Sequence, residues 1–237
     1  MNRKHSAERI QRLIPYAALS PRYETRNIMS RSAQTIRGHL PSYEGTGGID
    51  IESTLEALFA LRAHAAASVK SLVHQPMQIT ALQQAVPIGY TPDAAVCLAT
   101  GEHCLVEIKR EVELKTPEVL ARITAIRRTT ECVGIRLLCA TEAELARDAE
   151  NARIRTVRIH ARIFTRRESE ALKGRLGKRS TFTIGGATEI LGGRAAVLHL
   201  LAVRSLYMDY RQALTNESVV STNPTEANHD LALFSDW

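Results

Sequence analysis

One stretch of the chain, TPDAAVCLATGEHCLVEIKR at residues 91–110, constrains the fold more than any other. Two short runs in which side chains alternate, 93–98 and 104–109, flank a glycine-containing turn, and this pattern is typical of a β-hairpin. Successive side chains on a strand point to opposite faces. Pairing Leu98 with Cys104 therefore gives the hairpin one wholly apolar face, which we expect to pack on the core.

The other face of this hairpin gathers its charged side chains at one end. With the same pairing, Asp93 lies opposite Lys109, and Glu107 points to the same side as both. Two carboxylates and an ammonium group are thus expected to converge. A surface ion pair of little energetic value is the plain alternative, but the apolar back face and an acid-bearing helix upstream favour a functional site.

The surrounding sequence predicts a mixed α/β domain over residues 49–150. The segment 49–67 has apolar residues at helical spacing, and 69–90 contains short strand patterns around a proline. An amphipathic helix that begins with a capping Thr and a Pro follows at 116–133, and 135–141 is a buried strand. This order of helix, strands, helix and strand is typical of an α/β domain with a mixed sheet.

Three other regions flank this domain. Residues 1–48 form a basic N-terminal arm, rich in Arg and Ser, that ends in a Gly-rich turn. Residues 151–220 have helical character with Gly-rich turns and a small hairpin at 207–220, which predicts a small, mostly helical, winged-helix-like domain. Residues 221–237 form an acidic tail, whose apolar cluster either docks a partner or packs on its own domain.

A second basic zone runs from Arg147 to Arg179, with eleven Lys and Arg against four Asp and Glu. Arginine can hold a phosphate through two hydrogen bonds, and each contact releases condensed counterions. The zone therefore indicates a DNA-binding surface, with a solvated helix face as the alternative. The arginines expected to contact DNA are Arg153, Arg155, Arg158, Arg162, Arg166 and Arg167.

The charged end of the hairpin has the arrangement of a metal-dependent PD-(D/E)xK phosphodiesterase. Mg²⁺, for which Mn²⁺ can substitute, prefers hard oxygen ligands and leaves positions open for water and a phosphate oxygen. Lys109 would orient or help to deprotonate the attacking water and stabilise the charge that develops on the phosphate. A helical acid, either Glu52 or Glu56, would complete the site. The expected catalytic residues are Glu56, Asp93, Glu107 and Lys109, and the expected metal ligands are Glu56, Asp93, Glu107 and the backbone carbonyl of Ile108.

The chain resembles the TnsA family, the endonuclease subunit of heteromeric cut-and-paste DNA transposases of bacteria. The segments that carry the resemblance are ESTLEALFALRAHAAASVKSLVHQP, YTPDAAV, CLVEIKR and IRLLCATEAELA. The resemblance places the family's helical acid at Glu56, its strand acid at Asp93 and its catalytic lysine at Lys109, while Glu107 takes a position that is Glu or Gln in relatives. Gln75 matches a family position near the site.

This resemblance implies a restriction-endonuclease-like nuclease domain followed by a small winged-helix-like domain. The implied activity is Mg²⁺-dependent hydrolysis at the 5′ ends of a transposon during excision, while a DDE-type recombinase acts on the 3′ ends. An AAA+ ATPase regulator would bind the C-terminal domain or the tail. Two alternatives stay open: a stand-alone restriction or junction-resolving nuclease of the same fold, and a non-catalytic DNA-binding adaptor.

The composition bounds these possibilities. Hydrophobic residues make up 44% and charged residues 24% of the chain, which excludes collagen-like, coiled-coil and wholly disordered classes. No apolar run approaches the roughly 18 residues that a membrane span needs, and the N-terminus lacks the apolar core of a secretory signal. We therefore expect a cytoplasmic protein with no membrane partner, and the resemblance to the TnsA family implies association with the bacterial nucleoid.

Overall fold

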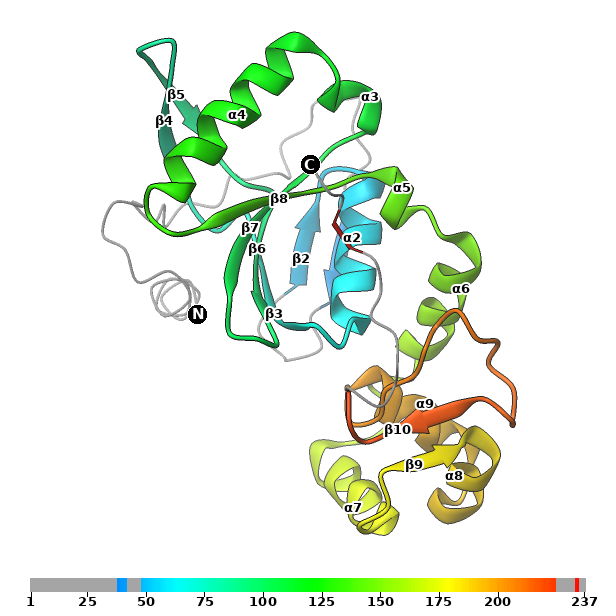
Figure 1. The fold of residues 1–237 in the computed structure, drawn as a ribbon. Coiled ribbons are helices and arrows are strands. Elements are labelled where there is room, and N and C mark those ends of the chain that lie inside the picture. The colour runs from blue at the N-terminus through cyan, green and yellow to red at the C-terminus, as the bar shows by residue number, and fades with distance from the viewer. Residues whose placement is uncertain (1–37, 42–47, 225–232, 235–237) are drawn as a thin grey trace.

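A computed structural model gives the fold of the chain (Figure 1). It describes residues 38–41, 48–224 and 233–234. Most of the predicted N-terminal arm therefore lies outside the described residues. The last part of the arm contributes strand β1 (Gly38–Pro41), which pairs antiparallel with β2 (Gly48–Ile51).

A four-stranded mixed sheet forms the centre of the larger unit. β3 pairs antiparallel with β6, and β6 pairs antiparallel with β7, whereas β7 and β8 run parallel. The α/β class with a mixed sheet is therefore confirmed. The four strands, in their order across the sheet, are β3 (Val69–His74), β6 (Ala94–Leu98), β7 (His103–Ile108) and β8 (Arg136–Ala140).

Helix α2 (Thr54–Ala65) covers the face of the sheet that the hairpin pattern predicted to be apolar (Figure 1). Val96 and Val106 lie in the same buried cluster as Phe59 of this helix, each at most 1% exposed. The predicted core face is therefore confirmed. Burying side chains of this size stabilises the fold by about 1.5–3 kcal/mol each.

The opposite face of the sheet is also buried, beyond what the alternation predicted. Ala95 and Leu105 belong to a second apolar cluster. Helix α4 (Pro117–Glu131) and the hairpin of β4 (Ile79–Gln83) and β5 (Val86–Tyr90) cover this face, and α4 contacts both β4 and β8. The charged residues at the end of the hairpin therefore lie at the rim of a core.

The pairing of β6 with β7 differs by two residues from the predicted one. Cys97, rather than Leu98, is the last residue of β6 that pairs with β7, and it lies opposite His103. The backbone N–H of Leu98 donates instead to the carbonyl of Glu102 across the turn, at 2.8 Å. The turn is thus shorter than predicted, but a shift of two residues keeps every side chain on its predicted face.

The predicted helix at 49–67 is wrong at its N-terminus. Residues 48–51 form β2, and the helix begins only after Ser53, whose hydroxyl accepts a hydrogen bond from the N–H of Glu56. Serine is a favoured cap because its side chain satisfies an otherwise unpaired helical N–H. Glu52 therefore precedes the helix and does not share a helical face with Glu56.

The predicted helix at 116–133 forms as α4, although Thr116 does not cap it through its side chain. The Thr116 hydroxyl donates instead to the carbonyl of Glu113, at the end of the short helix α3 (Glu111–Leu114). Pro117 at the first helical position confirms the predicted start.

The C-terminal part of the chain is a smaller, mostly helical unit, as predicted. Helix α6 (Asp148–Arg158) begins before the predicted domain boundary at residue 150, and it contacts both α2 and α9 (Arg194–Ala202) (Figure 1). The placement of that boundary stays a prediction. The elements after β8 are α5 (Glu142–Leu145), α6 (Asp148–Arg158), α7 (Arg166–Leu176), β9 (Thr181–Thr183), α8 (Ile184–Leu191), α9 (Arg194–Ala202) and β10 (Val219–Ser221).

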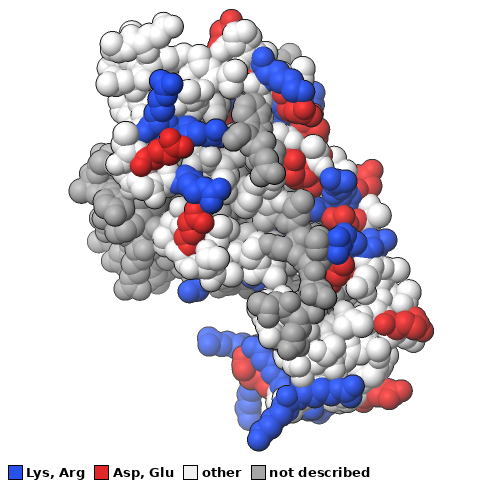
Figure 2. Space-filling model, in the orientation of Figure 1, with Lys and Arg blue, Asp and Glu red and all other residues white. Residues whose placement is uncertain are grey.

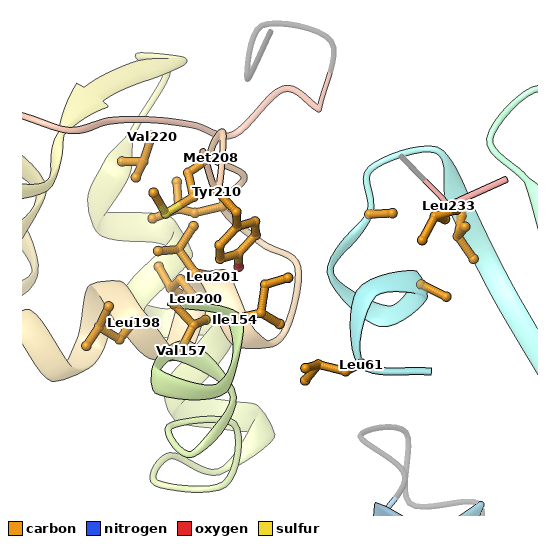
Figure 3. Packing of buried hydrophobic residues seen from close by; sticks show 14 of the residues in the cluster. Leu61, Ile154, Val157, Leu198, Leu200, Leu201, Met208, Tyr210, Val220 and Leu233 are labelled. Atoms are coloured by element: carbon orange, nitrogen blue, oxygen red, sulfur yellow. The ribbon is translucent and has the colours of Figure 1, made fainter. Parts of the chain in front are cut away.

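The hairpin predicted within residues 207–220 is wrong. β10 pairs antiparallel with β9, a partner distant in sequence, and Tyr207 contributes one isolated bridge to Ser221. Met208 and Tyr210, which follow Tyr207, instead pack their side chains inward (Figure 3). Core burial therefore decided the path of this segment.

Two residues of the predicted acidic tail pack on the chain itself. Leu233 is 2% exposed and belongs to the same core as α2. The ring of Phe234 lies 6.2 Å from that of Phe59, centre to centre. Of the two alternatives for the apolar cluster, packing on its own domain holds for these residues; the rest of the cluster lies outside the described residues.

One hydrophobic core connects the two units through α6. Ile154 and Val157 of α6 pack against Leu200 and Leu201 of α9 (Figure 3), and all four belong to the cluster that contains Phe59. Within the part of the chain that the structure describes, no helix has both the length and the apolar character needed to cross a bilayer.

A buried arginine fixes α6 to α2. Arg62 is 1% exposed, and its Nη2 atom lies 2.8 Å from Oε2 of Glu150. Its Nη1 donates to Oδ1 of Asn151 at 3.1 Å, and Nδ2 of Asn151 donates to the carbonyl of Leu145 at 2.7 Å. The charge of Arg62 is thus compensated in the core by residues far away in sequence.

Replacement of this arginine should therefore destabilise the whole fold. Removing one partner of a buried ion pair costs about 3–5 kcal/mol, and because the Glu150 side chain keeps 19% of its exposure, we expect about 3 kcal/mol for Arg62→Ala. Arg136→Ala, which breaks the exposed pair with Glu102, is the control and should cost less than about 1 kcal/mol. Urea unfolding measures both; equal losses would contradict this role of Arg62.

Candidate active site

The four predicted catalytic side chains come from elements that end near one another. Asp93 directly precedes β6, Glu107 is the penultimate residue of β7, Lys109 follows that strand, and Glu56 lies in the first turn of α2. The charges of Glu56, Glu107 and Lys109 all act on the carboxyl group of Asp93. The structure therefore brings all four predicted residues together.

Asp93 is held by hydrogen bonds from the two chain segments that flank it, β7 and the residue after β3. Its Oδ2 accepts a hydrogen bond from the backbone N–H of Ile108 at 2.7 Å. Its backbone carbonyl accepts one from the N–H of Gln75, just beyond β3, at 2.9 Å. Continuing the observed register of β6 and β7 places Asp93 opposite Glu107 rather than opposite Lys109. The Ile108 carbonyl as a metal ligand stays a prediction.

Glu107 is buried, with 4% of its surface exposed, and each of its carboxylate oxygens has a partner. The hydroxyl of Tyr90 donates to Oε2 at 2.5 Å, and Nζ of Lys109 lies 3.0 Å from Oε1. Hydrogen bonds to an ionised group are short and strong, so this pair of contacts fixes the carboxylate in one position.

Tyr90 is the site residue that the sequence analysis missed. It ends β5, and it is 5% exposed within the apolar cluster under α4. Its pattern in the sequence is that of a strand residue, and its pairing with Glu107 depends on how the β4–β5 hairpin folds over the sheet. A buried tyrosine needs a partner for its hydroxyl, which was the one available signal.

Glu56 is engaged with the N-terminus of its own helix. Its Oε2 accepts from the N–H of Glu52 at 3.0 Å, and its Oε1 accepts from the Ser53 hydroxyl at 2.9 Å. Glu52 lies outside the helix and accepts a hydrogen bond from Nε2 of Gln75 at 3.2 Å. Of the two candidate acids, Glu56 is the one that lies on α2, and its charge acts on Asp93, so we favour Glu56.

If the carboxylates of Asp93 and Glu107 were both ionised, the site would carry more negative charge than Lys109 compensates. Burial, and after it the charge of Glu107, raises the pKa of Asp93 to about 8, against the opposing effects of the Ile108 N–H and Lys109. Burial also raises the pKa of Glu56. Burial lowers the pKa of Lys109, but Glu107 outweighs this effect and the pKa is raised overall, so Lys109 keeps its positive charge at neutral pH.

The donor set suits a hard divalent cation bound through two carboxylates. Within the described ranges, no group of three or more His, Cys, Asp and Glu side chains is placed so that it could hold a metal ion. Mg²⁺, however, is often bound by one or two carboxylates together with water and substrate phosphate. Asp93 and Glu107 offer such a pair of oxygen donors, and a cation would relieve the repulsion that raises the pKa of Asp93.

The predicted DNA-binding arginines lie on α6, on α7 and between them, and they differ in exposure. Arg153 is half-buried, and its Nη1 donates to the carbonyls of Tyr210 at 2.8 Å and Arg211 at 3.1 Å. It therefore ties the segment before β10 to α6. Arg158 is also half-buried. The exposed members of the set are Arg155, Arg162, Arg166 and Arg167.

A separate pocket of about 470 Å³ lies between the tip of the β4–β5 hairpin and the outer face of α4. Leu82, Ala125 and Arg128 are among the residues that line it. None of the predicted site residues contributes to this pocket, so it plays no part in the arrangement described above.

Comparison of the chain with protein-family models gives no match, and comparison with curated proteins gives none either. The structure by itself defines an α/β protein in which two carboxylates and a lysine meet at the end of a mixed sheet. The resemblance to the TnsA family stays a prediction from the sequence.

The raised pKa of Asp93 predicts how stability depends on pH without metal. The folded protein keeps the Asp93 proton up to about pH 8, whereas the unfolded chain loses it near pH 4. Between these values the folded state binds more protons, so the free energy of unfolding contributed by Asp93 falls as pH rises. Asp93→Asn should remove this contribution.

The measurement is thermal or urea unfolding in EDTA from about pH 5 to about pH 9. Glu102→Gln, at the turn end of the same hairpin, serves as the control and should keep the wild-type slope. A slope that is the same in wild type and Asp93→Asn would show that Asp93 ionises normally.

Proposed function

We propose that the chain is a Mg²⁺-dependent DNA endonuclease that hydrolyses phosphodiester bonds. The observation that carries this proposal is the convergence of Asp93, Glu107 and Lys109, from the two strands of one hairpin, with Glu56 of α2 close by. Resemblance of the same residues to the TnsA family supports the more specific role of a transposase subunit that nicks the 5′ ends of a transposon during excision. In that role a DDE-type recombinase and an AAA+ ATPase would be its partners.

Asp93 and Glu107 would hold the metal ion, with Glu56 as a further ligand if its carboxylate leaves the helix N-terminus. When bound, Mg²⁺ (or Mn²⁺) supplies a Lewis acid that polarises the phosphoryl oxygen and lowers the pKa of water. The ion would also offset the mutual repulsion of these buried carboxylates.

Lys109 would act by charge. Because its pKa is raised above the ordinary value, its Nζ is an ammonium group at neutral pH. A fixed positive charge stabilises the negative charge that builds up on a phosphate during hydrolysis. With 35% of its side chain exposed, Lys109 can reach a phosphate from its present position beside Glu107. This favours electrostatic stabilisation and water orientation over deprotonation of the water.

Tyr90 would position Glu107 for this task. Its hydrogen bond to Oε2 leaves Oε1 to face Lys109. Such partners of a ligating carboxylate fix its orientation. The site therefore combines groups that act on substrate with one buried group that holds them in place.

Cleavage tests the proposal directly. Asp93→Ala should keep the fold and partner binding, yet lower the rate of 5′-strand nicking at transposon ends by at least about 100-fold, since it removes one of two principal ligands. Nicking is measured with Mg²⁺ in the presence and absence of the recombinase. Undiminished nicking by Asp93→Ala would reject the assignment, and efficient cutting of DNA by the wild type alone would favour a stand-alone nuclease.

Metal titration separates a nuclease from a DNA-binding adaptor. Calorimetry with Mn²⁺ should show binding by the wild type and at least about tenfold weaker binding by Glu107→Gln. Glu102→Gln, a glutamate at the other end of the same hairpin, is the matched control and should bind Mn²⁺ like the wild type. If all three proteins bound Mn²⁺ equally, or if none of them bound it, the result would favour the adaptor.

A further inference from the structure

The exposed surface of α7 and the turn after it carries a concentration of positive charge that the candidate active site does not use. Residues 166–179 hold six Lys and Arg against two Glu, and all six basic residues are exposed. Figure 2 shows Lys and Arg side chains gathered at this end of the molecule, over α7 and the turn that leads to β9.

The two glutamates of this surface are bound to local partners. Glu168 closes a capping box, in which the N–H and the hydroxyl of Thr165 both donate to its Oε2 at 2.7 Å. Glu170 pairs with Nζ of Lys173 at 3.0 Å. Glu168 is thus engaged by Thr165 at the start of the helix and Glu170 by Lys173, and the net charge of the surface stays positive.

Arg175, in the last turn of α7, donates through Nη1 to the carbonyl of Leu191 at 3.3 Å. The other four cations lie at the two ends of the helix. Arg166 and Arg167 begin α7, and Lys178 and Arg179 follow its end. α7 has 11 residues and is therefore about 16 Å long, and the two pairs lie at its ends. Side chains as long as these can reach phosphates on both sides of a DNA groove, which is about 12 Å wide in the major groove.

The face of α7 between these pairs is polar and small. Arg167, Ala171 and Gly174 follow one another at helical spacing, away from the buried Leu172 and Leu176. The large exposed apolar side chains of the described residues lie outside 166–182. Protein interfaces have an apolar centre, whereas DNA interfaces are polar and strongly positive, so this face suits a phosphate backbone better than a protein partner.

Helix α9, the last helix of the small unit, cannot make the same contact. Its residues from Ala196 to Leu201 are all buried. His199 is fixed there, with Nδ1 bonded to the carbonyl of His160 at 2.9 Å and Nε2 to the hydroxyl of Ser169 on α7 at 2.5 Å. These contacts hold α7 on the core and leave its outer face free to bind.

We propose that Arg166, Arg167, Lys178 and Arg179 form a surface that binds the phosphate backbone of double-stranded DNA without a metal ion. The choice of DNA among polyanions rests on the proposed function. In Figure 1, α7 lies at the opposite end of the molecule from α3, α4 and the β4–β5 hairpin, with α6 between. A duplex that reaches the candidate active site would thus be held at a second, distant place, and this contact supplies affinity independent of cleavage.

The salt dependence of binding tests this surface. Binding of a duplex of about 30 base pairs, roughly 100 Å long, is followed by fluorescence anisotropy in EDTA, on an Asp93→Asn background that removes the nuclease site. Each phosphate contact contributes about 0.9 to the slope of log K against log salt concentration. The triple variant Arg166→Gln, Arg167→Gln, Lys178→Gln should therefore lower the slope by about 2 to 3. Arg179 is kept because it stacks over the ring of Phe182, 5.3 Å from its centre.

The matched control removes three positive charges outside the predicted DNA-binding set, through Lys70→Gln, Arg122→Gln and Arg128→Gln, all exposed. It should keep a slope within about one contact, roughly 0.9, of the wild type, and circular dichroism checks that both triples are folded. Equal slopes for the two triple variants would overturn the proposal. A slope in the α7 triple variant that equals that of the wild type would also overturn it, and would favour an acidic protein as the partner of this surface. Because this experiment measures binding and not cleavage, its result does not depend on whether the nuclease assignment is correct. A negative binding result would likewise leave the nuclease assignment untouched.

Discussion

The burial of two carboxylates side by side at the end of a β-hairpin is the constraint on which the rest of the site depends. When both are ionised, Asp93 and Glu107 repel each other where water is largely excluded, and this repulsion costs free energy unless opposite charge or hydrogen bonds offset it. Lys109, Tyr90 and the N–H of Ile108 supply part of that compensation. The incomplete balance is typical of sites that act on a ligand, where perturbed pKa values are concentrated.

The architecture around this pair explains why the strain is tolerated. Both faces of the hairpin are packed, one under α2 and the other under α4 with the β4–β5 hairpin. The backbone of both strands is therefore fixed by apolar contacts before any charge is considered, and the carboxylates cannot move apart. A site built on rigid strands holds its groups more accurately than one built on loops.

The second unit is attached to the first by a core rather than by a flexible linker. α6 contributes apolar side chains toward α9 and polar groups toward Arg62 of α2, and Nη2 of Arg204 donates to the carbonyl of Ala66 at 3.1 Å. Packing of Leu233 and Phe234 near α2 adds a contact from the end of the chain. Through these contacts, the orientation of α7 is tied to that of the sheet.

Local pattern was enough for the parts of the fold that depend on neighbouring residues. The alternation in β6 and β7 predicted both faces of the hairpin, and the prediction survived an error of two residues in the pairing, because only an odd shift moves a side chain to the other face. The proline at its first position and the spacing of its apolar residues predicted α4. The start of α2 and the pairing of β10 were wrong, since a local cap and a distant strand decided them.

What the sequence by itself determined is therefore the placement of Asp93, Glu107 and Lys109 together at one end of the hairpin, because strand alternation puts them on one face whatever surrounds the hairpin. Tertiary structure alone decided which other groups meet them. Tyr90 reaches Glu107 across 17 residues, and Arg62 reaches Asn151 across 89, through packing that brings separate elements together. Such contacts depend on how whole elements bury their apolar surface, and that information is spread over the chain rather than held in any local pattern.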